Sequence, residues 1–197
     1  LPTQDSNPRA FAVAHKFAAT IVEKVDEGVG LYLYGVPSAE NPKGTGTGKT
    51  TTGVALVVQY LRERVKLEAK RERAIDGLPA YFVKMSKFQN VYNSMFRGSH
   101  GKTEEAADVF STLKTKMVKT DLLLIDDIGL RGMTEALQNE LYEIIDDREM
   151  NGKSTIFTSN MPLDSMGDIL SEQVVSRIDG MTHQIPLGGK DHRKKAL

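Results

Sequence analysis

The sequence predicts an α/β fold of three layers, in which helices cover both faces of a parallel sheet. Short β-rich runs alternate with longer helical periodicities along the chain, which is the order expected of such a sheet. The run Leu122-Leu123-Leu124-Ile125 is apolar at every position, as in a strand that is buried on both faces. A glycine-rich loop at 44–50 separates a strand candidate from a helix candidate, which places it at one edge of the sheet.

The composition is that of a globular protein. With 197 residues, 40% of them hydrophobic, the chain can build one domain with a full core. The 26 basic and 26 acidic residues cancel, so any contact with nucleic acid must come from a local patch. The absence of cysteine excludes disulfides and thiolate metal sites, and four scattered histidines predict no zinc site. No stretch has the roughly 20 apolar residues of a membrane span, so we predict a cytoplasmic protein without a membrane partner.

The first elements are a helix, a strand and a second helix. Apolar residues recur at helical spacing over 8–25, with Asn7 as the expected N-cap. The run 30–35 is a strand candidate, and the glycine-rich loop follows it. Residues 51–70 continue at helical spacing and end in alternating charges, which indicates a solvated helix end.

The middle of the chain predicts a strand and two helices. The run 80–85 is short and β-rich, and Ser86 is expected to cap the helix that follows it. Residues 97–102 form a polar, glycine-bearing loop, and the next helix is expected to start at Thr103.

The last third continues the same alternation. Residues 134–150 are amphipathic, 151–153 predict a turn, and 154–158 predict the next strand. Arg177 falls in a further helix, whose inner side carries Leu170, Val174 and Ile178.

The loop at 44–50 has the residue types of a phosphate-binding loop. Small residues let successive backbone N–H groups turn towards a polyphosphate, Lys49 supplies charge for the outer phosphates, and the Thr50 hydroxyl can complete a Mg²⁺ shell. A flexible Gly/Thr linker that precedes a lysine by chance is the alternative. The predicted nucleotide-binding residues are Gly44, Thr45, Gly46, Thr47, Gly48, Lys49, Thr50 and Thr51.

The loop departs from the strict pattern at one position. That pattern requires glycine five positions before Gly48, where this chain has Lys43. The nearest earlier glycine is Gly35, so residues 36–43 form a turn-rich insertion between strand and loop. We expect the insertion to alter the surroundings of the loop. The sequence therefore supports nucleotide binding more strongly than it supports hydrolysis.

Two carboxylates follow the apolar run at 122–125. Asp126 is placed to hold Mg²⁺ and Asp127 to polarise the water that attacks a γ-phosphate, as in a Walker B motif. By itself, a strand that ends in Asp could merely cap the next turn. The phosphate loop earlier in the chain favours the catalytic interpretation.

Asn160 and Arg177 complete the candidate catalytic set. Asn160 follows the strand at 154–158, where its amide can orient the lytic water. Arg177 can present a guanidinium to the γ-phosphate of a neighbouring subunit. Their alternatives are turn chemistry for Asn160 and a surface salt bridge for Arg177.

Taken together, these motifs resemble the AAA+ domain of DnaC/DnaI-type replicative helicase loaders over nearly the whole chain. The Asp-Asp-Ile-Gly and Thr-Ser-Asn endings of two strands are particular to this group and its transposition relatives. The segments that carry the resemblance are 7–17, 31–35, 46–50, 123–129, 141–148 and 155–160.

The resemblance implies a P-loop AAA+ core without a separate C-terminal lid domain, which binds ATP/ADP with Mg²⁺. It implies Walker A roles for Lys49 and Thr50, a sensor 1 role for Asn160, and an arginine finger at Arg177. Arg193 resembles a second sensor.

Family members also assemble side by side, contact single-stranded DNA, and grip a hexameric helicase through a separate N-terminal domain. That domain is missing here, as expected if Leu1 follows a cut within a longer protein. We assign 1–29 to a linker and helix and 30–197 to the AAA+ domain. The insertion and Lys43 indicate a divergent branch, encoded by a phage or another mobile element.

Residues for DNA contact are harder to assign. Arg97 and Lys102 lie in the loop after the second strand, and Arg131 lies just after the Walker B motif, where loops can face the axis of a ring. Taken alone, each residue fits a solvated surface charge better than a DNA contact.

The sequence thus predicts an ATP-hydrolysing protein that loads a replicative helicase onto single-stranded DNA and assembles in response to nucleotide. A transposition helper ATPase of the same family and a nucleotide-gated scaffold without hydrolysis are the alternatives. A small-molecule kinase is disfavoured, because no arginine-rich closing lid is evident.

Overall fold

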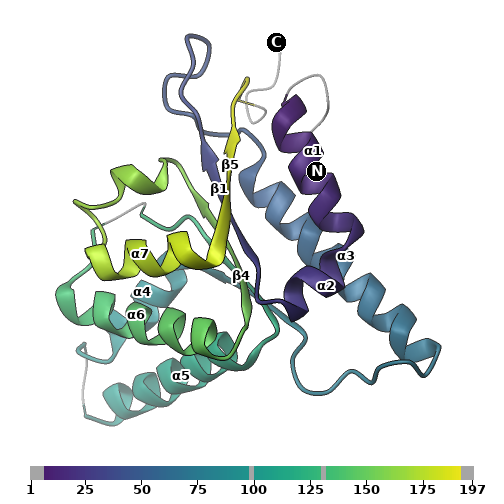
Figure 1. The fold of residues 1–197 in the computed structure, drawn as a ribbon. Helices are drawn as coiled ribbons and strands as arrows, with labels where there is room; N and C mark the ends of the chain where they lie inside the picture. The colour runs from purple at the N-terminus through teal and green to yellow at the C-terminus, as the bar shows by residue number, and fades with distance from the viewer. Residues whose placement is uncertain (1–6, 98–99, 130–131, 192–197) are drawn as a thin grey trace, which may run out of the picture.

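The computed structural model describes residues 7–97, 100–129 and 132–191, in which a five-stranded sheet lies between two layers of helices (Figure 1). All strand pairings are parallel, in the order β2-β3-β4-β1-β5. The strands are β1 (Gly30–Gly35), β2 (Ala80–Lys84), β3 (Leu122–Asp126), β4 (Ser154–Ser159) and β5 (Thr182–Leu187). The helices are α1 (Pro8–Ala19), α2 (Ile21–Asp26), α3 (Lys49–Ala69), α4 (Met85–Ser94), α5 (His100–Lys119), α6 (Glu135–Met150) and α7 (Glu172–Met181), with a short 3₁₀ turn η1 (Leu163–Ser165). The three-layer fold class predicted from the sequence is confirmed.

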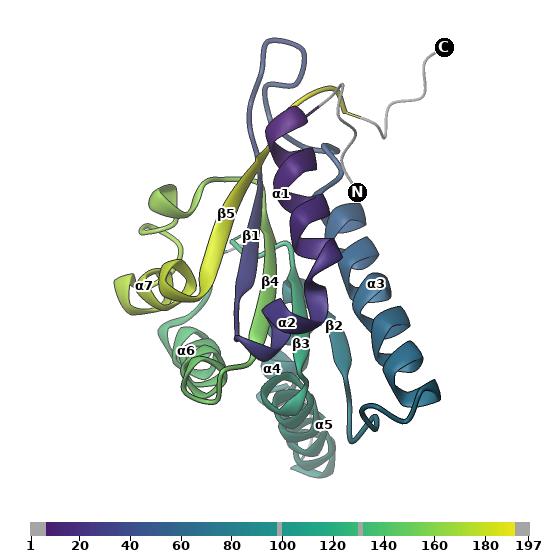
Figure 2. The same ribbon diagram turned by 45° about the vertical axis from the view of Figure 1, so that its right-hand side comes forward.

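The two faces of the sheet carry separate hydrophobic clusters. Helices α1, α2 and α3 cover one face, and α4 to α7 cover the other (Figure 2). Side chains alternate between these layers along each strand: Leu31 and Leu33 pack towards α3, whereas Tyr32 belongs to the opposite cluster. Because both faces are covered, the central strands are apolar throughout, as the sequence predicted for 122–125.

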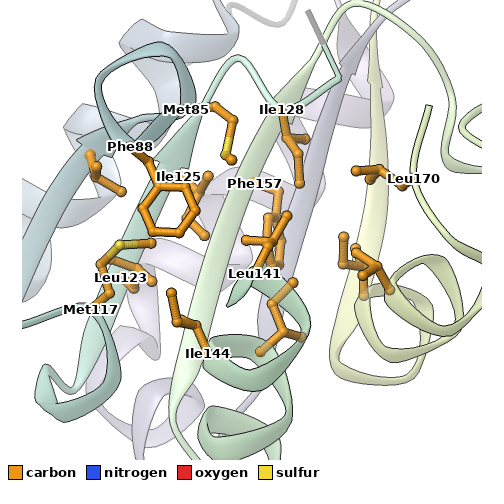
Figure 3. Packing of buried hydrophobic residues seen from close by; sticks show 14 of the residues in the cluster. Met85, Phe88, Met117, Leu123, Ile125, Ile128, Leu141, Ile144, Phe157 and Leu170 are labelled. Atoms are coloured by element: carbon orange, nitrogen blue, oxygen red, sulfur yellow. The ribbon is translucent and has the colours of Figure 1, made fainter. Parts of the chain in front are cut away.

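The larger cluster is shown in Figure 3. Leu123 and Ile125 of β3 and Phe157 of β4 point from the sheet into a layer formed by α4, α5 and α6. Phe88 and Leu141, which are fully buried, meet them from the helices. This packing fixes the positions of β3 and β4 and therefore of the residues at their carboxyl ends.

Arg148 of α6 is fully buried at the opposite edge of the sheet from those carboxyl ends. Its guanidinium donates to the Thr155 hydroxyl at 2.8 Å and to the carbonyls of Met117, Thr120 and Ser154 at 2.6, 2.8 and 2.5 Å. Burial lowers the pKa of Arg148 to about 9, so the side chain keeps its charge at neutral pH. One side chain thereby joins the end of α5 to the beginnings of β3 and β4.

The N-terminal part differs from expectation in two ways. The predicted single helix at 8–25 is two helices, since Thr20 leaves the helical region with φ −118° and ψ 30°. Asn7 does precede α1, but its side chain makes no capping hydrogen bond. Instead it exchanges two hydrogen bonds of 2.9 Å with the backbone of Gly188, just after β5.

Two predicted helix starts are wrong. Helix α4 begins at Met85, one residue after β2, so Ser86 lies in its first turn rather than at the cap. Helix α5 begins at His100 rather than at Thr103, so Lys102 belongs to a helix and not to the predicted loop. The Thr134 hydroxyl, in contrast, accepts a hydrogen bond from the Leu137 N–H and caps α6.

Along the described ranges, no helix has the length and apolar character needed to cross a bilayer.

Candidate nucleotide-binding site

The carboxyl ends of three neighbouring strands meet at one edge of the sheet, because β3, β4 and β1 lie side by side and run parallel. The glycine-rich loop follows β1, Asp126 ends β3, and Asn160 follows β4. In Figure 1 this edge lies at the top, beside the end of β5. The topology therefore brings three motifs predicted from the sequence together where parallel sheets bind ligands.

The glycine-rich loop uses backbone conformations that favour glycine. Gly44, Gly46 and Gly48 have φ values of 57°, 65° and 90°, and α3 begins directly after them at Lys49. Lys49 is buried, and its Nζ donates to the Gly44 carbonyl at 3.1 Å. A long helix that starts at the end of such a loop offers N–H groups and the positive end of its dipole to an anion.

The insertion at 36–43 loops out of this arrangement. Ser38 and Asn41 exchange backbone hydrogen bonds of 3.0 and 3.1 Å, which closes a turn that leaves Lys43 exposed. The chain then returns to β1 so closely that a Cβ on Gly35 would lie 2.0 Å from the Gly44 carbonyl oxygen. The base of the loop is thus closed by Gly35 and Gly44, and the position of Lys43 does not enter it.

Asp126 is buried and lies next to the start of α3. Its Oδ1 accepts hydrogen bonds of 2.7 Å from the Thr50 hydroxyl and from the Thr158 hydroxyl of β4. A hydroxyl and a carboxylate are hard oxygen ligands of the kind that Mg²⁺ uses, directly or through water. The donor set therefore fits Mg²⁺ at this position.

Asp127 has a left-handed backbone, with φ 61°, which is uncommon for a residue other than glycine. Its N–H donates to the Thr158 hydroxyl at 2.9 Å. Asn160 is half-buried and directly follows β4, the strand that lies between β3 and β1. Thr51 lies exposed in the first turn of α3.

Arg177 lies on α7, away from the loop. Its guanidinium contacts two carboxylates of α6, Asp146 at 2.8 Å and Glu149 at 2.6 Å. Hydrogen bonds to Tyr142 and Glu149 raise the pKa of Arg177, so it is charged at any physiological pH. Within one subunit, Arg177 thus makes the surface salt bridges that were the alternative to a finger.

The remaining predicted residues are dispersed or not placed. Arg193 and Arg131 lie outside the described residues. Arg97 is exposed after α4, and Lys102 is exposed on α5.

Comparison with known proteins identifies the family to which the chain belongs. The sequence profile of the IstB-like ATP-binding proteins matches residues 84–196, which is more than half of the chain. The chain belongs to the family of IstB-like ATP-binding proteins. The match begins at the last residue of β2, so the phosphate loop is assigned by its own geometry rather than by the profile.

Individual relatives of this IstB-like protein come from two settings. A Sinorhizobium fredii protein, named for ATP binding and an insertion sequence, is 29% identical over 43% of the chain, and the replicative helicase loader DnaC of Buchnera aphidicola is 25% identical over 61%. These matches cover 36% and 47% of the relatives, so the chain spans less than half of their length. A crystal structure of the DnaC helicase loader has a TM-score of 0.64 and 25% identity, over 95% of this chain and 93% of the other.

Sequence reasoning missed two groups at the site of this IstB-like domain. The first is the Thr158 hydroxyl, although the strand that contains it was identified. The second is the segment after β5, where the Asp191 carboxylate packs on the loop: a Cβ on Gly46 would lie 1.7 Å from Asp191 Oδ1, and the Thr45 hydroxyl donates to Oδ2 at 3.4 Å. Asn41 of the insertion holds this segment by donating to the carbonyls of Thr45 and Gly189. No local pattern signals the contacts of Thr158, the contacts of Asp191 or the bond from Asn41 to Gly189, because each of them joins residues at least 31 positions apart in sequence.

Proposed function

We propose that this IstB-like domain binds ATP with Mg²⁺ at the loop 44–51 and hydrolyses it to drive a step in DNA replication or transposition. The observation that carries the proposal is the 2.7 Å hydrogen bond between Thr50 and the buried Asp126. This bond places a hydroxyl and a carboxylate together at the start of α3, which is the arrangement needed to hold a metal beside a bound triphosphate.

In this proposal the loop binds the phosphates and Lys49 neutralises the outer ones. Thr50 and Asp126 would hold Mg²⁺, which would supply positive charge to offset that of the phosphates. Arg193 adds a second sensor of the nucleotide. ATP and ADP share these contacts, so both bind.

The hydrolytic residues act on a water molecule and on the γ-phosphate. Asn160 orients the water and Asp127 polarises it and accepts its proton, so that the water oxygen attacks the γ-phosphorus while the bond to the leaving ADP oxygen breaks. Arg177 is proposed to leave its partners on α6 and to stabilise the transferring phosphoryl group in a neighbouring subunit, which makes hydrolysis depend on self-association.

For the biological role, we propose loading of a replicative helicase onto single-stranded DNA. The match to the DnaC loader over nearly the full length of both chains supports it. The helicase would be bound by a separate N-terminal domain, and the AAA+ domain would comprise residues 30–197. DNA contact is proposed for Arg97, Lys102 and Arg131.

A role as a transposition helper is the second candidate, favoured by the family match and the insertion-sequence relative. A phage or other mobile element as the source fits this second setting.

The decisive experiment is ATP turnover per subunit, measured against protein concentration with Mg²⁺ and with or without single-stranded DNA. A rate per subunit that rises with concentration or DNA is expected, because the site is completed in trans. ATP binding without turnover at any concentration would refute hydrolysis by this domain and favour the nucleotide-gated scaffold.

Three variants and one matched control assign the roles. Lys49→Ala should lose ATP binding, whereas Asp127→Asn should keep ATP and lose turnover. Arg177→Ala should keep binding and lose the concentration-dependent part of the rate. Asp146→Asn removes one of the two ion pairs of Arg177 from its other side and leaves the guanidinium in place; a finger role requires that this variant retain turnover.

The two biological roles need full-length protein and its partners. Release of the host's replicative hexameric helicase onto single-stranded circular DNA, scored by unwinding, tests loading. Stimulation of strand transfer by the cognate transposase tests the alternative. A positive result in only one assay decides between them.

A further inference from the structure

The Thr158 hydroxyl lies at the centre of the hydrogen bonds that join the candidate metal site to the candidate catalytic residue. It donates to Asp126 Oδ1 at 2.7 Å and accepts from the Asp127 N–H at 2.9 Å. The same Oδ1 also accepts from the Thr50 hydroxyl. Thr158 is fully buried, so water does not compete for these bonds.

The direction of these bonds is set by chemistry. A hydroxyl has one proton, and because Asp126 is an acceptor when ionised, the proton of Thr158 points to it. The lone pairs of Thr158 are then available for the Asp127 N–H. Two hydroxyl donors on a single oxygen fix the rotation of the Asp126 carboxylate, and neither bond uses its Oδ2.

The backbone of Thr158 reinforces the arrangement. Its carbonyl accepts from the Ile128 N–H at 2.9 Å, so both neighbouring amides after Asp126 are tied to one residue of β4. Asp127 lies between these ties in its left-handed conformation, which aspartate adopts more readily than most residues with a side chain but which is still uncommon.

A buried threonine in a strand is ordinarily a packing residue, and valine would fill the same space. The face of β4 that carries Thr158 also carries Ile156, and it packs against the apolar side of α3. A hydroxyl in this layer is costly unless it has partners. Here both of its partners belong to the two Walker B aspartates, which a packing role does not require.

We propose that Thr158 is a positioning residue for phosphoryl transfer: it orients Asp126 towards Mg²⁺ and holds the backbone of Asp127 in place. The inference rests on the proposed function and adds a specific role for β4 besides Asn160. When a group that orients a metal ligand by hydrogen bonding to it is removed, the metal affinity commonly falls by about 10–100-fold.

Two matched pairs of variants isolate the hydroxyl. Wild type and Thr158→Val differ by a hydroxyl exchanged for a methyl, and Thr158→Ser and Thr158→Ala differ by the hydroxyl alone. Nucleotide affinity is measured by titration with and without Mg²⁺, together with turnover against Mg²⁺ concentration. Circular dichroism verifies folding, and the Ser/Ala pair remains informative if Val does not fold.

We expect the two variants without a hydroxyl to require about tenfold more Mg²⁺ and to lose most turnover, while ATP affinity in EDTA stays within about twofold. Thr158→Ser should restore both readouts. Equal Mg²⁺ dependence within either folded pair would overturn the proposal. If the wild type binds ATP but never turns it over, the proposed hydrolysis fails separately, and the Mg²⁺ dependence of affinity still tests Thr158.

Discussion

Replacing Arg148 by methionine tests whether one buried side chain holds the far edge of the sheet together. Methionine has a similar length and fills much of the same space, so the change removes mainly the guanidinium. Four of its hydrogen bonds are between 2.5 and 2.8 Å long, to the Thr155 hydroxyl and to the carbonyls of Met117, Thr120 and Ser154.

The magnitude follows from those four acceptors. A buried acceptor that loses its donor costs about 1 kcal/mol or more, and four of them cost at least about 4 kcal/mol. Removal of a desolvated charge returns part of this. We therefore expect Arg148→Met to lower the free energy of unfolding by about 3–5 kcal/mol, a large part of the 5–15 kcal/mol typical of a domain.

The assay is urea denaturation followed by far-UV circular dichroism, which suits a chain without tryptophan. Arg148→Lys keeps the charge but replaces the planar fork by a single ammonium group, so it should also lose stability. Arg62, exposed on α3, provides the control, and Arg62→Met should change stability by no more than about 0.5 kcal/mol. A loss below about 1 kcal/mol in Arg148→Met, at an unchanged denaturant slope, would refute the reasoning.

Two further predictions concern Asp191 and Tyr32. Asp191→Asn removes a carboxylate that packs on Gly46 of the phosphate loop, so ATP affinity measured by calorimetry should rise about fivefold, equivalent to ~1 kcal/mol; unchanged or weaker binding contradicts this. Burial raises the pKa of Tyr32 to about 12. Because the folded state keeps this proton where the unfolded chain has lost it, stability should fall by about 2–3 kcal/mol between pH 10 and 12. Tyr32→Phe should remove that part of the pH dependence in urea titrations, and an identical profile contradicts it.

The fold was predictable because its signals are local. Four apolar residues before Asp126, and glycines before Lys49, are read from neighbours in sequence, and the parallel topology then brings them to one edge. The errors at Thr20 and Ser86 concern boundaries, where weak capping preferences yield to tertiary packing: Thr20 breaks a helix without a Pro or Gly signal, and β2 runs directly into α4.

The parts of the site that could not be predicted depend on distant contacts. Thr158 and Asp126 lie on neighbouring strands but are 32 positions apart in sequence. Asp191 and Thr45, which are also hydrogen-bonded, are 146 positions apart. Arg177 was placed on the correct helix, with the buried Val174 and Ile178 behind it, but the predicted Leu170 lies before α7, which begins at Glu172. The ion pairs of Arg177 with α6 follow from helix packing rather than from any pattern around it.

The place of β1 in the sheet has a consequence for the order of folding. β1 is made before the other four strands of the sheet, yet its two neighbours, β4 and β5, are the last of them to be made. Closing such long loops is slow, and until then an apolar strand has no partner on either side. A nascent chain is therefore most prone to aggregate while β1 waits, and the phosphate loop, which depends on β1, acquires its shape only when the last strands arrive. On this reasoning, the phosphate loop can bind a nucleotide only after the last strands of the domain have been made.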